Sequence, residues 1–313
     1  MTAAAPVRVA VIGVGHLGQH HARLLAGLDG AALAAVVDTR PGRAAEIAAA
    51  YGAVAFTDAR DVLGMVDAVS IAVPTVSHLE VALPFIERGV AVLVEKPLAA
   101  SLAEADRLLD AAARHGVIVA AGHTERFNPA VVAALPLVDA PRFVEVHRLG
   151  TFPERSLDID VIFDLMIHDL DLLLAAVRSE VTSIEAVGVN VLTPRVDIAN
   201  VRVRFASGCI ANLTASRISR ERVRKARFFQ PRSYVSIDYA AQEVEVYRLV
   251  AGADRPNIEG GRLDVIKDEP LRRELEDFVS AVRERRPPGV TGAAGRDALA
   301  LATRIAGAME QAT

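Results

Sequence analysis

The chain has 313 residues, more than one compact domain usually holds, so we expect two domains. Its 52% hydrophobic and 24% charged residues are typical of a globular protein, and its net charge of −4 offers no overall attraction to nucleic acid or an anionic membrane. The single cysteine, Cys209, allows no disulfide within the chain and fits no zinc-ligand pattern, so no metal is expected. No apolar run approaches the roughly 20 residues that span a bilayer, and we expect a cytoplasmic protein.

The first part of the chain alternates short β-branched runs with alanine-rich amphipathic stretches, which is typical of a parallel sheet with helices on both faces. The expected strands are Val7–Ile12, Ala32–Asp38, Ala68–Ala72, Ala91–Glu95 and Val117–Ala121. The expected helices are Leu17–Leu28, Pro41–Tyr51, Val76–Arg88 and Leu102–His115. Ser101 and Glu104 have the spacing of a capping box at the start of the last helix. We therefore predict a doubly wound Rossmann domain over residues 1–122.

A glycine motif lies where the first strand is expected to end and the first helix to begin. Gly13 permits a tight turn, Gly15 lets the backbone approach a pyrophosphate, and Gly18 lets helix and strand pack closely. The N-terminus of the following helix offers N–H groups to an anion. This context predicts a dinucleotide site, to which His16 and Leu17 inside the loop also contribute.

One acidic residue is expected to determine whether the domain prefers NAD or NADP. Asp38 comes twenty residues after Gly18, at the end of the second expected strand, where it can accept hydrogen bonds from the adenosine ribose. This favours NAD over NADP, and Thr39 lies next to it. Arg40 and Arg43 leave NADP open as the less favoured cofactor, because a guanidinium can hold a 2′-phosphate.

A lysine, an acid and a histidine are the candidate catalytic residues. Lys96 follows the strand Ala91–Glu95 at the carboxyl edge of the sheet, where open α/β folds bind ligands. Asp164 and His168 are four residues apart, so a helix from about Asp160 to Val177 brings them onto one face. Alcohol oxidation needs a group that takes the hydroxyl proton and cations that stabilise the alkoxide. An exposed lysine and a solvated helix face remain the alternative.

From residue 123 onward, consecutive strands follow one another with little helix between them. The expected strands are Val181–Leu192, Ile198–Phe205, Ile210–Ser216, Val223–Phe229, Tyr234–Asp238 and Val244–Leu249. Two helices, about Pro270–Arg285 and Gly295–Gln311, are expected to follow, and the last of them could pack back on the first domain. We predict an α+β domain over residues 123–313 with a mainly antiparallel open sheet, which binds substrate and forms a homodimer or homotetramer.

Arginines are denser between Ser216 and Phe229 than elsewhere in the chain. If Arg220, Arg222 and Arg224 are extended, they lie on one side of a strand and form a cationic row suited to a diphosphate. The equal alternative is that the Arg217–Arg227 cluster is a solvated edge or a subunit interface.

These motifs resemble the Gfo/Idh/MocA family, which includes glucose–fructose oxidoreductase and inositol dehydrogenase. The resemblance spans essentially the whole chain and rests on Gly13–Gly18, Ala72–Thr75, Glu95–Pro97, and Asp164 with His168. It implies that Lys96 and His168 flank the reacting carbon, with His168 as proton acceptor and Asp164 contacting the substrate or the histidine. Beyond the glycine loop and Asp38, the expected cofactor contacts are Val73, Pro74, Thr75, His78, Glu95 and Lys96.

A narrower resemblance suggests a substrate. The segments His123–Pro129, Asp160–His168 and Arg227–Pro231 look most like family members that oxidise UDP-N-acetylglucosamine-type sugars at C3. Arg126 and Asn128 are candidate substrate contacts, although Arg126 could instead pair with an acid.

The leading hypothesis is therefore an NAD-dependent nucleotide-sugar 3-dehydrogenase. An inositol or simple sugar dehydrogenase is the alternative within the same class. A non-catalytic, NAD(P)-sensing regulatory protein is the alternative from another class. The presence of Lys96, Asp164 and His168 argues against that last alternative.

Overall fold

The computed structural model describes residues 5–152, 158–252 and 255–310 and divides into two compact units. Unit 1 comprises the chain up to Thr124 together with Leu271–Leu299, and unit 2 comprises Glu125–Pro270 and the chain from Ala300. The chain therefore crosses between the units more than once, and does not divide at a single residue as expected from the sequence. Within the described ranges, no helix is both long and apolar enough to cross a membrane.

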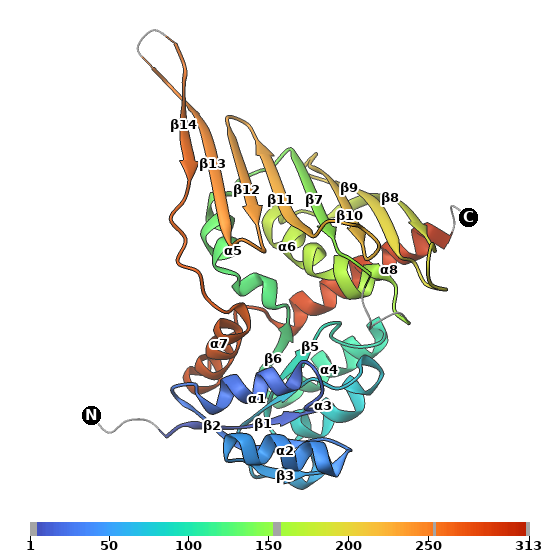
Figure 1. Ribbon diagram of the computed structural model, residues 1–313, viewed down its shortest axis with the longest axis vertical. Coiled ribbons are helices and arrows are strands. Elements are labelled where there is room, and N and C mark those ends of the chain that lie inside the picture. The colour runs from blue at the N-terminus through green and yellow to red at the C-terminus, as the bar shows by residue number, and fades with distance from the viewer. Residues whose placement is uncertain (1–4, 153–157, 253–254, 311–313) are drawn as a thin grey trace. The chain divides into compact units, whose positions relative to one another are not determined.

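Unit 1 is built around a parallel sheet of six strands in the order β3-β2-β1-β4-β5-β6 (Figure 1). The strands are β1 Val7–Ile12, β2 Ala31–Val37, β3 Val54–Phe56, β4 Ala68–Ile71, β5 Ala91–Glu95 and β6 Val119–Gly122. The helices are α1 Gly18–Ala26, α2 Pro41–Tyr51, α3 His78–Glu87 and α4 Leu102–His115. The predicted Rossmann architecture is confirmed. The short strand β3 was not predicted, because its three residues are largely exposed and lack a buried apolar run.

Helix α7 (Pro270–Glu284) completes the core of unit 1. Its residues Leu275, Phe278 and Val279 are buried in the same cluster as side chains of β1 and α1. The glutamate on its first turns, Glu274, is buried and accepts a hydrogen bond from Thr124 at 3.1 Å. The segment belongs to unit 1 because its apolar stripe is buried there.

Unit 2 contains an eight-stranded sheet in the order β14-β13-β12-β11-β7-β10-β9-β8. Its strands are β7 Phe143–Leu149, β8 Val181–Val189, β9 Ile198–Phe205, β10 Ile210–Ser216, β11 Val223–Gln230, β12 Ser233–Asp238, β13 Glu243–Val250 and β14 Asn257–Arg262. The pair β7–β10 is parallel and the other neighbouring pairs are antiparallel, so the predicted mainly antiparallel sheet is confirmed. The sequence analysis missed β7, although its side chains alternate between buried and half-buried.

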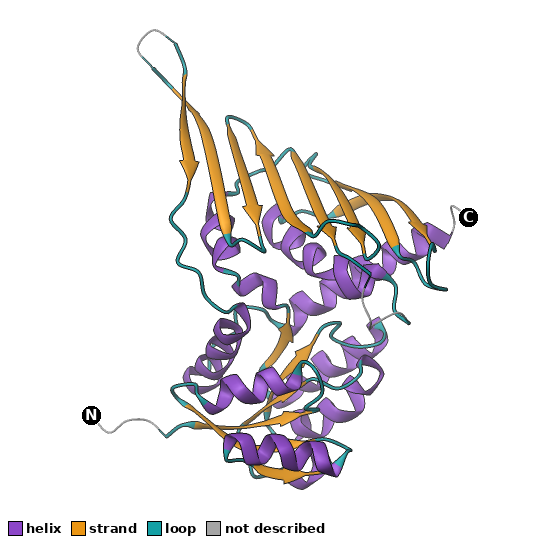
Figure 2. Ribbon diagram, viewed as in Figure 1, coloured by secondary structure: helices purple, strands orange, loops and turns teal. Residues whose placement is uncertain are grey.

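Helices cover one face of this sheet (Figure 2). Helix α5 (Pro129–Ala134) lies against β12 and β13, and the segment before α6 (Ile167–Val177) contacts β10. The covered face buries apolar side chains such as Val146, Leu213 and Val235. On the other face a row of aromatic rings crosses four neighbouring strands: Phe143, Phe229, Tyr234 and Tyr247. We call this second face the open face.

The helix expected from Asp160 to Val177 begins with a π-turn. Residues Ile162–Met166 form the π-helical segment, and α6 continues from Ile167 as a regular α-helix. Asp164 lies in the π-helical segment, and His168 lies in the first turn of α6.

Candidate active site

The glycine loop between β1 and α1 has the close contacts that its motif predicts. Gly13 has φ +82°, and a Cβ there would lie 2.8 Å from the carbonyl oxygen of Ala72. A Cβ at Gly18 would lie 1.8 Å from the carbonyl oxygen of Gly13, so only glycine allows this turn. By contrast, no atom lies within 4 Å of a Cβ built on Gly15, which leaves room for a pyrophosphate beside the backbone.

Asp38 is bound to the glycine loop and to Arg40. It is 7% exposed and accepts hydrogen bonds from the Val14 N–H at 3.2 Å and from the Arg40 Nε at 3.0 Å. Burial alone would raise the pKa of Asp38, but the hydrogen bonds and charge of Arg40 lower it below its usual value. Asp38 is therefore ionised at neutral pH and can accept ribose hydroxyls if Arg40, which is exposed, moves aside.

The guanidinium group of Arg43 also contacts the glycine loop. Its Nε donates to the carbonyl oxygen of Val14 at 2.8 Å, and its Nη2 donates to Gln19 at 2.8 Å. This guanidinium therefore supports the protein's own backbone. Arg40 and Arg43 were the reason that NADP remained an alternative cofactor. Of the two, Arg40 is the one whose guanidinium contacts the carboxylate of Asp38. His16, Leu17 and Thr39 are exposed.

His78 joins the two loops that carry the other predicted cofactor contacts. Its Nδ1 lies 3.0 Å from the carbonyl oxygen of Pro97, and its Nε2 lies 3.0 Å from that of Val73. The ring is 1% exposed, and burial lowers its pKa despite these acceptors. His78 therefore holds the 73–75 and 96–97 loops together, and its direct contact with the cofactor stays a prediction.

Lys96 is half-buried and follows β5 directly. Its backbone N–H donates to the Glu95 carboxylate at 3.2 Å. Glu95 is itself 7% exposed and contacts His21, so the side chain expected to touch the cofactor instead supports the loop of Lys96. His21 was assigned to the protein surface or a structural role by the sequence analysis, and no motif signalled its contact with Glu95.

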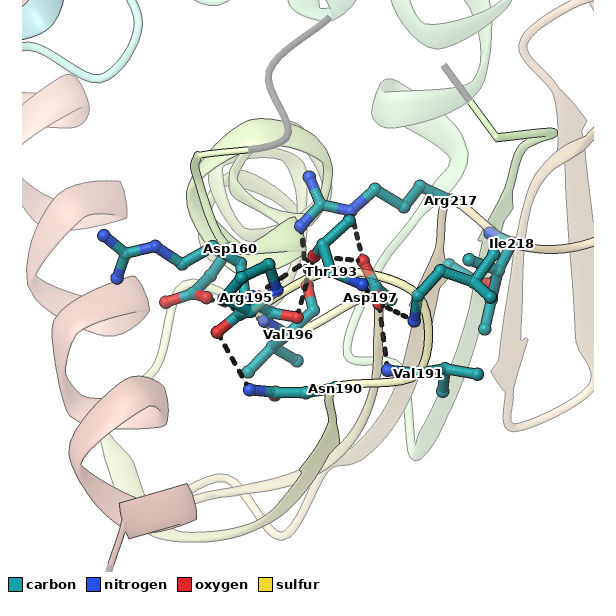
Figure 3. A network of polar contacts seen from close by, with 12 residues as sticks. Asp160, Asn190, Val191, Thr193, Arg195, Val196, Asp197, Arg217 and Ile218 are labelled. Carbon is teal, nitrogen blue, oxygen red and sulfur yellow. Dashed lines mark hydrogen bonds and ion pairs between the residues drawn. The ribbon is translucent and has the colours of Figure 1, made fainter. Parts of the chain in front are cut away.

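Asp164 and His168 are half-buried residues of unit 2, in the π-turn and in the first turn of α6. The start of this segment is fixed by Asp160, whose carboxylate accepts the Val196 N–H at 2.9 Å. Val196 belongs to a turn that a second acid organises (Figure 3). Asp197 accepts the backbone N–H groups of residues 191, 192 and 193 at 2.9, 2.6 and 2.9 Å.

Arg217, at one end of the arginine cluster, is part of this turn and is only 2% exposed. Its Nε donates to Asp197 at 2.9 Å, and its Nη2 donates to the Val196 carbonyl oxygen at 3.2 Å (Figure 3). Burial would raise the pKa of Asp197, but the hydrogen bonds from residues 191–193 lower it far below its usual range. Arg217 is therefore a structural cation and is not available to a substrate.

The expected arginine row is only partly formed. Arg220 and Arg222 precede β11, in a bend, so the two-residue period of a strand applies to Arg224 alone. Arg222 donates to Thr151 at 3.4 Å. Arg224 is paired in register with Arg148, and burial and the charges of Arg148 and Arg222 lower its pKa.

Arg148 is the centre of a buried charge cluster beside Arg224. It donates to Asp169 at 2.7 and 2.8 Å and to Glu125 at 3.3 Å, and it lies 5.5 Å from the ring centre of Tyr239. The two carboxylates balance the two guanidinium groups, so this end of the sheet is a compact, highly polar site.

The two candidate substrate contacts near residue 126 have structural partners. Arg126 lies 3.6 Å from the carboxylate of Asp171, as the ion-pair alternative anticipated. Asn128 is 2% exposed, caps α5 by accepting the Ala130 N–H at 3.0 Å, and donates to the Tyr239 carbonyl oxygen at 3.0 Å. The side-chain amide of Asn128 is therefore engaged within unit 2, and its contact with substrate stays a prediction.

Comparison with known proteins identifies the family. Residues 7–123 match the family described as oxidoreductase family, NAD-binding Rossmann fold (GFO_IDH_MocA), and residues 142–235 match the GFO/IDH/MocA C-terminal domain. The chain belongs to the Gfo/Idh/MocA family. It is accordingly an oxidoreductase whose Rossmann unit binds NAD, as the glycine loop and Asp38 indicated.

Members of the Gfo/Idh/MocA family resemble this chain to different extents. UDP-N-acetylglucosamine 3-dehydrogenase of Acidithiobacillus ferrooxidans is 41% identical over 308 residues, 97% of both chains. A solved structure of that enzyme has a TM-score of 0.92 at 39% identity and covers 98% of this chain and 99% of that one. The scyllo-inositol 2-dehydrogenase (NAD(+)) of Bacillus subtilis is 32% identical over 232 residues, 68% of each chain. Levoglucosan dehydrogenase in complex with NADH has the same fold, with a TM-score of 0.88 at 19% identity over 98% of this chain and 97% of that one.

Proposed function

We propose that this protein oxidises the C3 hydroxyl of a UDP-N-acetylglucosamine-type nucleotide sugar, with NAD as hydride acceptor. The observation that carries the proposal is the 41% identity to UDP-N-acetylglucosamine 3-dehydrogenase along 97% of the chain. The inositol dehydrogenase of Bacillus subtilis matches only 68% of the chain, at 32% identity.

Lys96, Asp164 and His168 are assigned to the chemical step. The sugar loses a hydride from C3 and a proton from the C3 hydroxyl, which leaves a ketone. Bound NAD⁺ supplies the hydride acceptor, C4 of its nicotinamide ring. His168 takes the hydroxyl proton, the Lys96 ammonium stabilises the developing alkoxide, and Asp164 orients the sugar or the imidazole.

The diphosphate of the substrate is assigned to Arg222 and Arg224. Guanidinium groups bind phosphate oxygens through paired N–H donors, and Arg224 is already crowded by the neighbouring cation Arg148. Arg220 is the third candidate, exposed in the bend before β11.

The test is a substrate panel. Purified protein with NAD is offered UDP-N-acetylglucosamine, UDP-N-acetylgalactosamine, myo-inositol, scyllo-inositol and glucose, and NADH formation is followed at its near-ultraviolet absorbance. We expect turnover with a UDP-sugar. Reduction of the product with borodeuteride should place deuterium at C3, as read by NMR. Turnover restricted to a free polyol would contradict the nucleotide-sugar assignment.

A second candidate function is inositol or simple sugar oxidation, which the match to scyllo-inositol 2-dehydrogenase favours. The two functions differ in their need for a phosphate site. Arg222→Ala and Arg224→Ala should raise KM for a UDP-sugar about 10-fold or more, since each removes a charge-assisted contact. The same variants should leave oxidation of an inositol unchanged if that is the true reaction.

We also propose that the protein is a homodimer or homotetramer in the cytoplasm. The aromatic row on the open face, which includes Phe229 and Tyr247, supports association through that face. The single cysteine, Cys209, is buried and supports a compartment in which disulfides are not needed.

A further inference from the structure

Three buried side chains of unit 1 form a chain of polar contacts that ends at the backbone of Lys96. The Oγ of Ser70 on β4 lies 2.7 Å from Nδ1 of His21 on α1. Nε2 of the same imidazole lies 3.1 Å from Oε1 of Glu95, the last residue of β5. The other carboxylate oxygen, Oε2, accepts the backbone N–H of Lys96 at 3.2 Å. The three side chains are at most 9% exposed.

Which of these side chains donate hydrogen bonds and which accept them depends on the charge of Glu95. Burial alone would raise the pKa of Glu95, but the hydrogen bond from His21 and the nearby charge of Lys96 lower it below its usual value. An ionised Glu95 only accepts hydrogen bonds, so in its 3.1 Å contact with Nε2 of His21 the imidazole is the side that can donate. Nδ1 of the same ring contacts the Ser70 hydroxyl, which can serve as a hydrogen-bond donor or as an acceptor.

A buried carboxylate is costly unless hydrogen bonds and a nearby cation offset the loss of water. The protein also leaves space for this carboxylate at Gly122. A Cβ on Gly122 would lie 3.1 Å from Oε2 of Glu95 and 2.9 Å from the Cα of Glu95. Strand β6 therefore carries glycine at a position where a side chain would press on the backbone and carboxylate of Glu95.

We propose that the Ser70–His21–Glu95 chain positions Lys96 for the reaction, with His21 as the residue that fixes the orientation of the carboxylate. One oxygen of Glu95 is held by His21, which leaves the other aimed at the Lys96 backbone and keeps a fixed negative charge beside its ammonium. The inference rests on the proposed function, since it takes Lys96 as a catalytic residue.

The same order of hydroxyl, imidazole and carboxylate occurs in hydrolytic triads, which offers another assignment. It fails here because Ser70 is 0% exposed and lies within the sheet, so no substrate reaches its Oγ. The contacts of Ser70, His21 and Glu95 end at the backbone N–H of Lys96, so their proposed function is to position that residue.

The test compares two replacements of His21. His21→Leu removes the donor to Glu95, and we expect kcat to fall about 10- to 100-fold, because small displacements of a catalytic group have effects of this size. KM and the NAD dissociation constant, measured by calorimetry, should change less than about 3-fold. His21→Gln restores an N–H donor of similar reach and should recover kcat to within about 5-fold of the wild type.

Leu24→Ala is the matched control, because Leu24 is a buried residue of the same helix that belongs to the apolar core of unit 1. It should lower the melting temperature at least as much as His21→Leu while kcat stays within about 2-fold. Gly122→Ala provides an independent variant that displaces Glu95 from the other side and should reproduce the kcat loss of His21→Leu. Equal kcat in wild type and His21→Leu, or no recovery in His21→Gln, would overturn the proposal.

A readout without turnover separates this inference from the proposed function. Hydrogen exchange of a peptide that contains Lys96, normalised to strand β1 in the same sample, should speed up about 10-fold or more in His21→Leu and remain slow in Leu24→Ala. If no substrate is oxidised by the wild type but exchange responds in this way, the proposed function fails and the positioning of Lys96 stands. Unchanged exchange contradicts the positioning itself.

Discussion

Lys96 lies in a loop whose backbone is held by contacts that involve three side chains. Glu95 accepts its backbone N–H, His21 holds Glu95, and His78 holds the carbonyl oxygen of Pro97. A lysine ammonium is a point charge on a flexible stem, so its effect on a reacting oxygen depends on how firmly its backbone is placed. The residues that support the loop are therefore as relevant to function as the lysine itself.

Replacing Lys96 with methionine tests its assigned role at similar side-chain volume. Turnover should fall at least about 10²-fold, because a positioned charged group is lost from the chemical step. The dissociation constant for NAD should change less than about 3-fold, as measured by calorimetry. Lys267→Met alters an exposed lysine of unit 2 and should match the wild type in both measurements. A wild-type rate in Lys96→Met would remove the lysine from the mechanism.

Asp171 gives a pH-dependent prediction with a definite sign. Burial raises the pKa of Asp171 from 3.8 to about 6, and Arg126 only partly opposes this. The folded state therefore binds more protons than the unfolded state between these values, so this carboxyl stabilises the fold less as pH rises through that window. Above the raised pKa the ionised carboxylate costs about 2–3 kcal/mol relative to an unperturbed acid.

Asp171→Asn removes that titration. Between pH 4 and pH 7.5 the unfolding free energy of the variant, relative to wild type, should increase by about 2–3 kcal/mol. Loss of the partner of Arg126 adds an offset that does not depend on pH in this range. Urea unfolding curves at several pH values measure the difference, and a difference that stays constant with pH would contradict the assignment.

At the scale of elements, the ends of helices and strands fix most of the named side chains. The π-turn Ile162–Met166 carries Asp164, and its start is held by the contact between Asp160 and Val196. π-turns interrupt regular helices at a cost in packing and occur often at functional sites. The pattern of residues predicted one continuous α-helix here, because a single wider turn changes the spacing of apolar residues too little to be recognised in the sequence.

Helix α4 offers a quantitative test of a predicted cap. Ser101 accepts the Glu104 N–H at 3.2 Å, and the Glu104 carboxylate reaches back to the Ala100 N–H at 3.1 Å. Ser101→Ala should lower the unfolding free energy by about 1 kcal/mol, while Ser101→Gly should lower it by only a few tenths. Chemical denaturation measures both. Equal losses in the two variants would show that the hydroxyl is not the stabilising group.

At the scale of the whole molecule, the open face of the eight-stranded sheet is the surface that monomers seldom leave uncovered. Exposed apolar side chains on it include Val187 at 54%, Val189 at 48% and Tyr247 at 41%. Exposed apolar side chains on a sheet face are consistent with the proposed association through that face.

Light scattering after size exclusion should give a mass of at least twice the 33.3 kDa of one chain. Tyr247→Glu should shift the mass toward the monomer, because an unpaired charge in an apolar interface is costly. Val54→Glu changes another exposed apolar residue, on β3 of unit 1, and should leave the mass unchanged. A monomeric wild type at micromolar concentration contradicts the proposed association.

The sequence by itself determined the parts that depend on local spacing. The glycine loop, Asp38 at the end of β2 and Lys96 at the end of β5 follow from strand and helix periodicity together with a short motif. The nearly complete strand set of both sheets follows for the same reason, since alternation and β-branched runs are local properties. Strands β3, β7 and β14 were missed, being short, exposed or overlooked between clearer segments.

Only the tertiary structure decided which distant residues meet. It placed β7 between β10 and β11, assigned α7 to the core of unit 1, and buried Arg217 against Asp197. It also brought His21 of α1 to Glu95 of β5, a contact that no spacing along the chain indicates. Burial and long-range pairing are set by how the elements pack, and a side chain's partner is fixed only when its surroundings are complete.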